Sequence, residues 1–108
     1  MNDRKHRRKL GQNYLVDPVI LFEIERAINP HNNNLFFEIG PGTGALTSQL
    51  MGQNIRITAM DLDKKNVDML MEKYSDAKHE FLHGDVLRES LEFLRISKHR
   101  VVGNLPYN

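Results

Sequence analysis

Leu35-Phe36-Phe37-Glu38-Ile39-Gly40-Pro41-Gly42-Thr43-Gly44 is the stretch that decides the fold of this 108-residue chain. A short apolar run bounded by glycines is typical of a buried strand, and Ala45-Leu46-Thr47 after it is typical of a helix start. The alternating glycines therefore lie in a strand-to-helix turn. Such a turn needs residues that accept a positive φ and lack a Cβ, so that the backbone can lie against a ligand at the partly positive helix N-terminus. We predict a site for a nucleoside-containing cofactor.

The sequence of the glycine loop does not by itself identify the ligand. The run 40–45 also satisfies the looser dinucleotide fingerprint, which allows Ala at its last position, so it fits either NAD or a nucleoside sulfonium. A glycine-rich hairpin turn without a ligand is the other reading of the same residues. The hairpin interpretation is the weaker one, because the sequence predicts both a strand before the loop and a helix after it.

Composition limits the class of protein. With 40% hydrophobic residues the chain predicts one small domain with a single sheet layer, and no cysteine is available for a disulfide or a thiolate metal site. His79 and His83 could share one strand face, but no third ligand is apparent, so we expect no metal. No run approaches the roughly 20 apolar residues of a membrane span, and the start lacks a secretory signal, which predicts a cytoplasmic protein without membrane contact.

The net charge of +1 is unevenly placed, because the first ten residues hold a basic tail against a single Asp3. Tails of this kind commonly contact nucleic-acid phosphates, although a solubilising end explains the composition equally well. The tail residues are Arg4, Lys5, Arg7, Arg8 and Lys9.

Helices and strands are expected to alternate along the rest of the chain. A first helix is predicted after an Asp17 N-cap with Pro18 at its first position, packing an apolar stripe on the sheet. That stripe consists of Ile20, Leu21, Ile24, Ala27 and Ile28. Strands are expected at 55–60, 79–83 and 100–103, and helices at 45–51, after the capping residue Asp63 and at 88–94. Alternation of this kind predicts right-handed crossovers and a parallel sheet.

The four predicted strands end in residues suited to ligand binding, namely Gly40, Asp61, Asp85 and Asn104. In an open parallel sheet, ligands bind beyond the carboxyl ends of the strands. Asp61 follows Gly40 by about the 20 residues at which an acid accepts hydrogen bonds from ribose hydroxyls, and it has no evident structural role. Asp85 could accept from an adenine amine, or it could cap the helix that follows.

The last strand is followed by Asn104-Leu105-Pro106-Tyr107, which favours methyl transfer over hydride transfer. The carbonyl oxygens of Asn104 and Leu105 could accept from the N6 hydrogens of an adenine and localise its lone pair. Pro106 fixes the loop, and Tyr107 offers a face on which an extruded base can stack. Placing this nitrogen in line with a sulfonium methyl lowers the barrier without a strongly perturbed base.

Three motifs together resemble the rRNA adenine N6-dimethyltransferase family: residues 37–47, Leu10-Gly11-Gln12-Asn13-Tyr14-Leu15 and Asn104-Leu105-Pro106-Tyr107-Asn108. The likeness is nearest to bacterial members that dimethylate two adjacent adenosines near the 3′ end of small-subunit (16S) rRNA during ribosome assembly. It implies a class I, Rossmann-like α/β fold that uses S-adenosylmethionine, and the small ribosomal subunit precursor as partner. The implied cofactor-binding residues are Asn13, Leu15, Glu38, Gly40, Gly42, Asp61, Asp85 and Asn104, and the implied catalytic residues are Asn104, Leu105, Pro106 and Tyr107.

The chain departs from the family in two respects. The ribose-binding acid is more often Glu, so Asp61 reaches about one methylene less far. Relatives also continue to a seven-stranded sheet and a helical domain, so we expect 1–16 to be a basic lead segment and 17–108 to be the N-terminal half of the methyltransferase domain, truncated after the fourth strand. Val101 and Val102 should then lie on an unpaired edge through which the piece could self-associate, whereas the parent is expected to be a monomer.

Three other functions fit part of the sequence. A non-catalytic rRNA-binding assembly factor would use the tail and the sheet edge for docking. A large-subunit rRNA adenine dimethyltransferase that confers antibiotic resistance would share all three motifs. An NAD-dependent oxidoreductase would explain the glycine loop but not residues 104–107.

Overall fold

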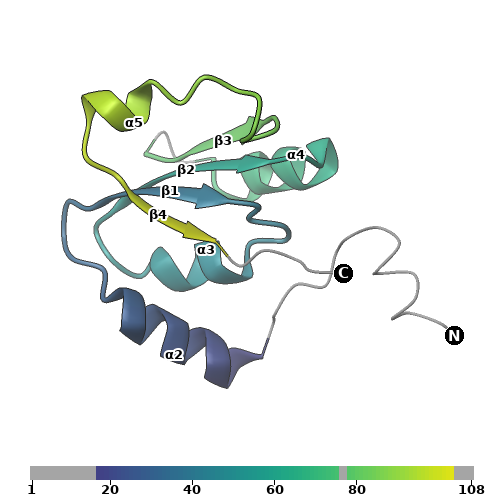
Figure 1. The fold of residues 1–108 in the computed structure, drawn as a ribbon. Coiled ribbons are helices and arrows are strands. Elements are labelled where there is room, and N and C mark those ends of the chain that lie inside the picture. The colour runs from purple at the N-terminus through teal and green to yellow at the C-terminus, as the bar shows by residue number, and fades with distance from the viewer. Residues whose placement is uncertain (1–16, 76–77, 104–108) are drawn as a thin grey trace, which may run out of the picture.

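A computed structural model describes residues 17–75 and 78–103. These residues form one parallel sheet in the order β3-β2-β1-β4, flanked by helices (Figure 1). The alternation of strands and helices and the parallel pairing that the sequence predicts are both confirmed. The elements in chain order are α2 (Pro18–Ile28), β1 (Leu35–Ile39), α3 (Ala45–Leu50), β2 (Arg56–Asp61), α4 (Lys64–Lys73), β3 (Glu80–His83), α5 (Phe93–Ile96) and β4 (Arg100–Gly103).

The core fills the space between one face of the sheet and the helices α3 and α4. Side chains alternate between the two faces of a strand, so Phe36 of β1 and Phe81 of β3 both point to this face. Leu46 and Leu50 of α3 meet them there and are almost completely buried. The other members of this cluster are Ile55, Ile57, Ala59, Val67 and Leu70.

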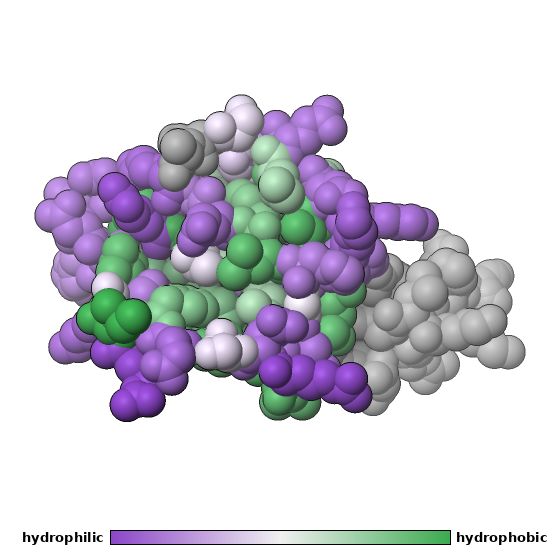
Figure 2. Space-filling model, turned by 90° about the horizontal axis from the view of Figure 1, so that it is seen from above, coloured by the Kyte–Doolittle hydropathy of each residue, from purple (hydrophilic) through white to green (hydrophobic). Residues whose placement is uncertain are grey.

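The opposite face of the sheet carries the short helix α5. Phe37 of β1 contacts the ring of Phe93 edge-on, with ring centroids 5.3 Å apart. Figure 2 views the molecule from this side, where hydrophobic side chains gather between hydrophilic ones. Ile96 of α5 is 81% exposed, so its side chain is not packed on this face.

Helix α2 begins where the sequence predicts, but it packs mainly on α3. Asp17 caps it by accepting from the backbone N–H of Val19 at 2.9 Å. The prediction that its apolar stripe packs on the sheet is confirmed only in part, because α2 contacts α3 and two residues of the stripe, Ile24 and Ile28, reach the core. Leu21 is buried and Ile24 contacts the core, whereas Ile20 remains 45% exposed.

The predicted helix at 88–94 is also wrong. Residues 86–89 form a turn, and the helix that follows, α5, has only four residues. The backbone carbonyl of Asp85 accepts from the N–H groups of Arg88 and Glu89, which closes this turn. Leu87 is 90% exposed, whereas Leu91 and Leu94 are part-buried, so the three leucines do not share one buried helix face.

Within the described residues, β4 pairs with β1 on one side and forms an edge of the sheet on the other. Val101 is 56% exposed and Val102 is partly buried against the core, so the predicted apolar edge is present in this part of the chain. The helices in residues 17–75 and 78–103 are all too short or too polar to cross a membrane.

Candidate functional site at the carboxyl edge of the sheet

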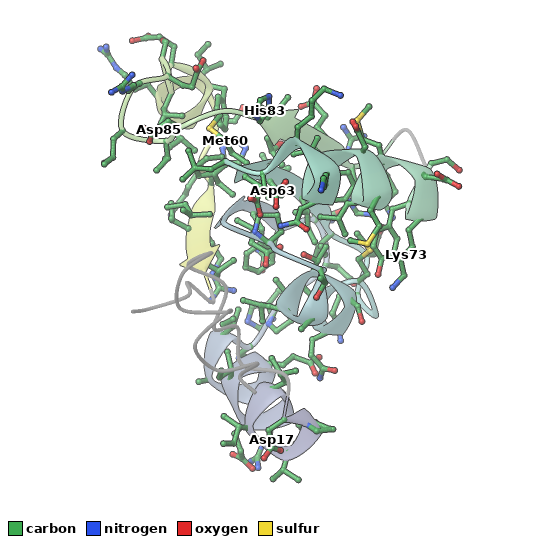
Figure 3. The ribbon with its side chains drawn as sticks, turned by 90° about the vertical axis from the view of Figure 1, so that its right-hand side faces the viewer. Asp17, Met60, Asp63, Lys73, His83 and Asp85 are labelled. Atoms are coloured by element: carbon green, nitrogen blue, oxygen red, sulfur yellow. The ribbon has the colours of Figure 1, made fainter. Side chains whose placement is uncertain are left out.

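The ends of β1, β2 and β3 are joined to one another at a single edge of the sheet. The backbone N–H of Gly40 donates to the carbonyl of Met60 at 2.8 Å, and that of Gly84 donates to the carbonyl of Asp61 at 3.0 Å. Figure 3 looks onto this edge, where the labelled Met60, Asp63, His83 and Asp85 lie together, far from Asp17. Three of the four predicted strand-end residues, Gly40, Asp61 and Asp85, are therefore neighbours.

The glycine loop has the backbone conformation that its sequence predicts. Gly40, Gly42 and Gly44 have φ angles of 65°, 60° and 92°, in the left-handed region that favours glycine. Gly44 also lies against α4, since a Cβ at this position would stand 2.8 Å from Cδ2 of Leu70. Residues with side chains would strain this turn and push its backbone away from a ligand.

Asp61 holds the glycine loop from the end of β2. It is 5% exposed, its Oδ2 accepts from the backbone N–H of Gly42 at 2.8 Å, and its Oδ1 accepts from the N–H of Asp63 at 2.9 Å. The expectation that Asp61 has no structural role is therefore wrong. Each carboxylate oxygen can accept more than one hydrogen bond, so the group retains acceptor capacity for a ligand hydroxyl.

Glu38 is completely buried two residues before Gly40. Its Oε1 accepts a short hydrogen bond of 2.5 Å from the hydroxyl of Thr47, and its Oε2 has no partner among the described residues. Burial raises the pKa of Glu38 to about 7, the hydroxyl of Thr47 opposes this shift, and the negative charge of Asp61 adds to it. An unpaired buried oxygen beside the loop fits a site that takes a cationic ligand.

Asp85 organises its own turn. Its Oδ1 accepts from the N–H of Leu87 at 2.9 Å, and its Oδ2 lies 3.7 Å from Nε of Arg88. The alternative that Asp85 acts as a cap is therefore confirmed, for a turn and not for a helix. The neighbouring acid Asp63 caps α4 as predicted, by accepting from the N–H of Lys65 at 2.9 Å.

Sequence reasoning missed Leu62 and Leu87, which follow closely after Asp61 and Asp85. Leu62 is 70% exposed and Leu87 is 90% exposed, although both are large and apolar. Each is an apolar residue in the polar segment that follows a strand, and this placement could have identified them. They offer apolar surface at the edge where a planar base could lie.

The other predicted site residues lie outside the part of the chain that the structure describes. These are Asn13, Leu15, the basic tail and the segment 104–107. Gly103 of β4 pairs with Ile39 of β1, so β4 leads toward the same edge as the other strands. Among the described residues no group of three acids or histidines could hold a metal ion.

A cavity of about 650 Å³ lies at the opposite, amino edge of the sheet, beside Leu35, Lys98 and Arg100. The guanidinium of Arg100 donates to the carbonyls of Ile28 and Asn29 at the end of α2. These are carbonyls that a helix C-terminus leaves without intrahelical partners. Arg100 thus links the end of α2 to β4 by hydrogen bonds. The glycine loop and the acids predicted to bind a ligand lie at the other edge of the sheet.

The parallel sheet, the positive-φ glycine loop after β1 and the acid at the end of β2 define a class I methyltransferase fold. Solved structures with this fold include a dimethyladenosine transferase from Plasmodium falciparum, with a TM-score of 0.72 and 25% identity over 88% of this chain and 34% of the other. The 23S rRNA methyltransferase ErmE has the same TM-score and identity over 89% of this chain and 38% of the other.

Residues 3–108 match the family model of ribosomal RNA adenine dimethylases, so the chain belongs to that family. It is 42% identical over 105 residues to ribosomal RNA small subunit methyltransferase A of Pseudomonas putida, covering 94% of this chain and 39% of that protein. The protein of the same name from Prochlorococcus marinus is 38% identical over 112 residues, covering 100% and 41%. The chain thus spans about two fifths of the length of these relatives.

Proposed function

We propose that the whole protein transfers methyl groups from S-adenosylmethionine to N6 of two adjacent adenosines near the 3′ end of small-subunit rRNA, in the cytoplasm, during ribosome assembly. The observation that carries this proposal is the carboxylate of Asp61, which holds the loop at Gly42 and keeps acceptor capacity at the edge. Relatives named small subunit methyltransferase A supply the substrate class.

The residues at the carboxyl edge of the sheet offer hydrogen-bond acceptors for the ribose, the adenine and the cationic groups of S-adenosylmethionine. The backbone of Gly40 and Gly42 can lie close to the ligand, because neither residue has a Cβ. Asp61 would accept from the ribose hydroxyls, and Asp85 would accept from the adenine amine with the capacity that its turn leaves free. The carboxyl of Glu38 offers an unpaired oxygen to a cation. Asn13 and Leu15 would add contacts from the lead segment.

The target adenine would be held by residues 104–107. When bound, S-adenosylmethionine supplies an electrophilic methyl group, so the protein has to position the attacking nitrogen. The carbonyl oxygens of Asn104 and Leu105 would accept from the N6 hydrogens, Pro106 would fix the loop and Tyr107 would stack on the base. Asn104 would also contact the cofactor, which would bring donor and acceptor together.

The basic tail would bind rRNA phosphates. If its five basic residues contact single-stranded phosphates, the logarithm of RNA affinity should fall with the logarithm of salt concentration at a slope of roughly −3.5, from about −0.7 per contact. A slope that is unchanged after the tail residues are replaced by Ala would exclude this contact.

The test of the proposed function is transfer of a labelled methyl group to small-subunit rRNA by the whole protein. Asn104→Ala should lose transfer with its circular dichroism spectrum retained, whereas Asn32→Ala, in an exposed turn away from this edge, should transfer normally. Transfer that survives Asn104→Ala would remove the role given to Asn104. Transfer absent from the unaltered protein would contradict the function and favour a non-catalytic assembly factor.

A large-subunit rRNA methyltransferase is the second candidate, because ErmE is as similar in structure as the dimethyladenosine transferase. The same assay with large-subunit rRNA distinguishes the two. We expect the label in small-subunit rRNA, since the curated relatives with 38% and 42% identity carry that name.

A further inference from the structure

We propose that Glu38 is a positioning residue whose carboxyl gives up its proton to solvent when the cationic methyl donor binds at the glycine loop. This inference rests on the proposed function, because it requires a sulfonium donor that also carries an ammonium group. It adds that cofactor binding and proton release are one linked equilibrium.

Glu38 lies directly under the glycine loop, where its carboxyl can respond to a charge bound there. Glu38 ends the buried part of β1, and Thr47 lies in the first turn of α3, so their hydrogen bond spans the glycine loop that connects the two elements. Oε2 of Glu38 is buried and has no partner among the described residues. The rest of the loop is fixed, because Asp61 holds Gly42.

No described cation offsets a negative charge on Glu38. The residues paired with it on β2 and β4 are Ala59 and Val102, and α3 contains no ionisable residue. Arg100 lies over the ring of Phe36 and is held by the carbonyls at the end of α2. Asp61 is the ionisable neighbour from β2, and its negative charge opposes ionisation of Glu38.

The protonation of Glu38 therefore depends on what occupies the site. Burial and Asp61 raise its pKa to about 7 in the free protein, so the carboxyl is largely protonated below that pH. A cation bound beside the loop favours the carboxylate and lowers the pKa. Binding must then release a proton below about pH 7, and the affinity for the donor must rise with pH up to about 7 and then level off.

Isothermal titration calorimetry of S-adenosylmethionine into the whole protein measures this release directly. The observed heat depends on the ionisation enthalpy of the buffer in proportion to the protons released. At pH 6.5 we expect more than about half a proton per donor bound, and at pH 8.5 close to none. S-adenosylhomocysteine has the ammonium but no sulfonium charge, so release with both ligands assigns the effect to the ammonium, and release with the donor alone assigns it to the sulfonium.

Two variants separate a proton-linked role from a structural one. Glu38→Gln keeps the shape of the side chain and should bind without proton release at either pH. Thr47→Val removes the hydroxyl that favours the carboxylate, so the pKa of Glu38 should rise and proton release should extend to higher pH than in the unaltered protein. Ser48→Ala, at an exposed neighbouring position of α3, is the matched control and should behave as the unaltered protein does.

The outcomes are distinguishable. Heats independent of the buffer at pH 6.5, together with saturable binding, would overturn the role of Glu38 and leave the proposed function in place. Proton release that is unchanged in Glu38→Gln would assign the proton to another group and also overturn it. Absence of any donor binding would overturn both the inference and the function on which it rests.

Discussion

Asp61 is the last residue of β2 and Asp85 lies two residues after the neighbouring strand β3, yet their carboxylates accept hydrogen bonds from different kinds of partner. Asp61 is buried, and its two oxygens accept from N–H groups on two sides, one in the glycine loop and one before α4. Asp85 is part-exposed, and it accepts from an N–H two residues further along its own turn. The first acid joins separate segments of the chain, whereas the second closes a local loop.

The difference divides the carboxyl edge into a rigid part and an adaptable part. The glycine loop is fixed by Asp61, by the Glu38–Thr47 hydrogen bond and by the contact of Gly44 with α4. In the turn after β3, Asp85 accepts from residues of its own turn, beside an exposed Leu87, and Gly84 is joined to β2 by a backbone hydrogen bond to Asp61. We expect the rigid part to set where the donor binds and the turn to adjust around its adenine.

The largest effect is expected for Gly44→Ala. An alanine at φ 92° is strained, and its Cβ would meet the buried Leu70 at 2.8 Å, so we predict a loss of about 2 to 5 kcal/mol in the free energy of unfolding. Urea unfolding measures it. Gly52→Ala is the matched control, because no heavy atom lies within 4 Å of its Cβ position, and a change as large as that of Gly44→Ala would refute a loop fixed by close packing.

Glu38→Gln should change how stability depends on pH in the absence of donor. The folded-state pKa of Glu38 is raised from 4.5 to about 7, so the folded protein binds the proton more tightly and loses stability as pH rises through this range. The loss is on the order of 3 kcal/mol, at 1.36 kcal/mol per unit. Urea unfolding at pH 5 and pH 8 should show it in the unaltered protein and not in Glu38→Gln.

Glu72→Gln, at an exposed position of α4, is the control for that experiment and should keep the original pH dependence. An identical pH dependence in Glu38→Gln and in the unaltered protein would mean that the buried carboxyl does not titrate in this range.

Asp61→Asn should destabilise the protein by about 1 to 3 kcal/mol, measured by the same unfolding experiment. The N–H groups of Gly42 and Asp63 donate to different oxygens of Asp61, and asparagine replaces one of these oxygens by an NH2 group, so one of the two donors would lose its acceptor. Donor affinity should fall as well, because the loop loses its support. Stability equal to that of the unaltered protein would show that Asp61 does not join the two segments.

The smallest effect is expected for Asp85→Asn, below about 0.5 kcal/mol. Asparagine forms the same side-chain turn as aspartate, so the hydrogen bond from Leu87 is retained. A loss equal to that of Asp61→Asn would end the distinction between the two acids. Comparing the midpoints of thermal unfolding of the two variants tests this most simply.

The strands and the glycine loop could be predicted from the sequence because local rules determine them. The apolar run 35–39, the glycines after it and the Asp17-Pro18 helix start each act over a few residues. The prediction of a helix at 88–94 was wrong because the spacing of leucines does not show whether the fold offers a surface on which they can be buried. The packing of α2 was predicted only in part because the position of this helix depends on its contacts with α3. The sequence of α2 alone does not reveal those contacts.

The candidate site was predicted only in part for a similar reason. Strand ends converge by topology, so Gly40, Asp61 and Asp85 could be placed at one edge from the order of elements. Which donors each carboxylate accepts from depends on three-dimensional contacts, and the structural role of Asp61 was therefore missed. Leu62 and Leu87 were missed because exposure of an apolar residue cannot be read from its type.

Equilibrium dialysis of the whole protein against S-adenosylmethionine and against NAD tests the central claim most directly, namely that the carboxyl edge is a site for a sulfonium donor. We predict saturation by S-adenosylmethionine at one molecule per chain, competition by S-adenosylhomocysteine and no retention of NAD. Saturable binding of NAD without binding of S-adenosylmethionine would contradict the account.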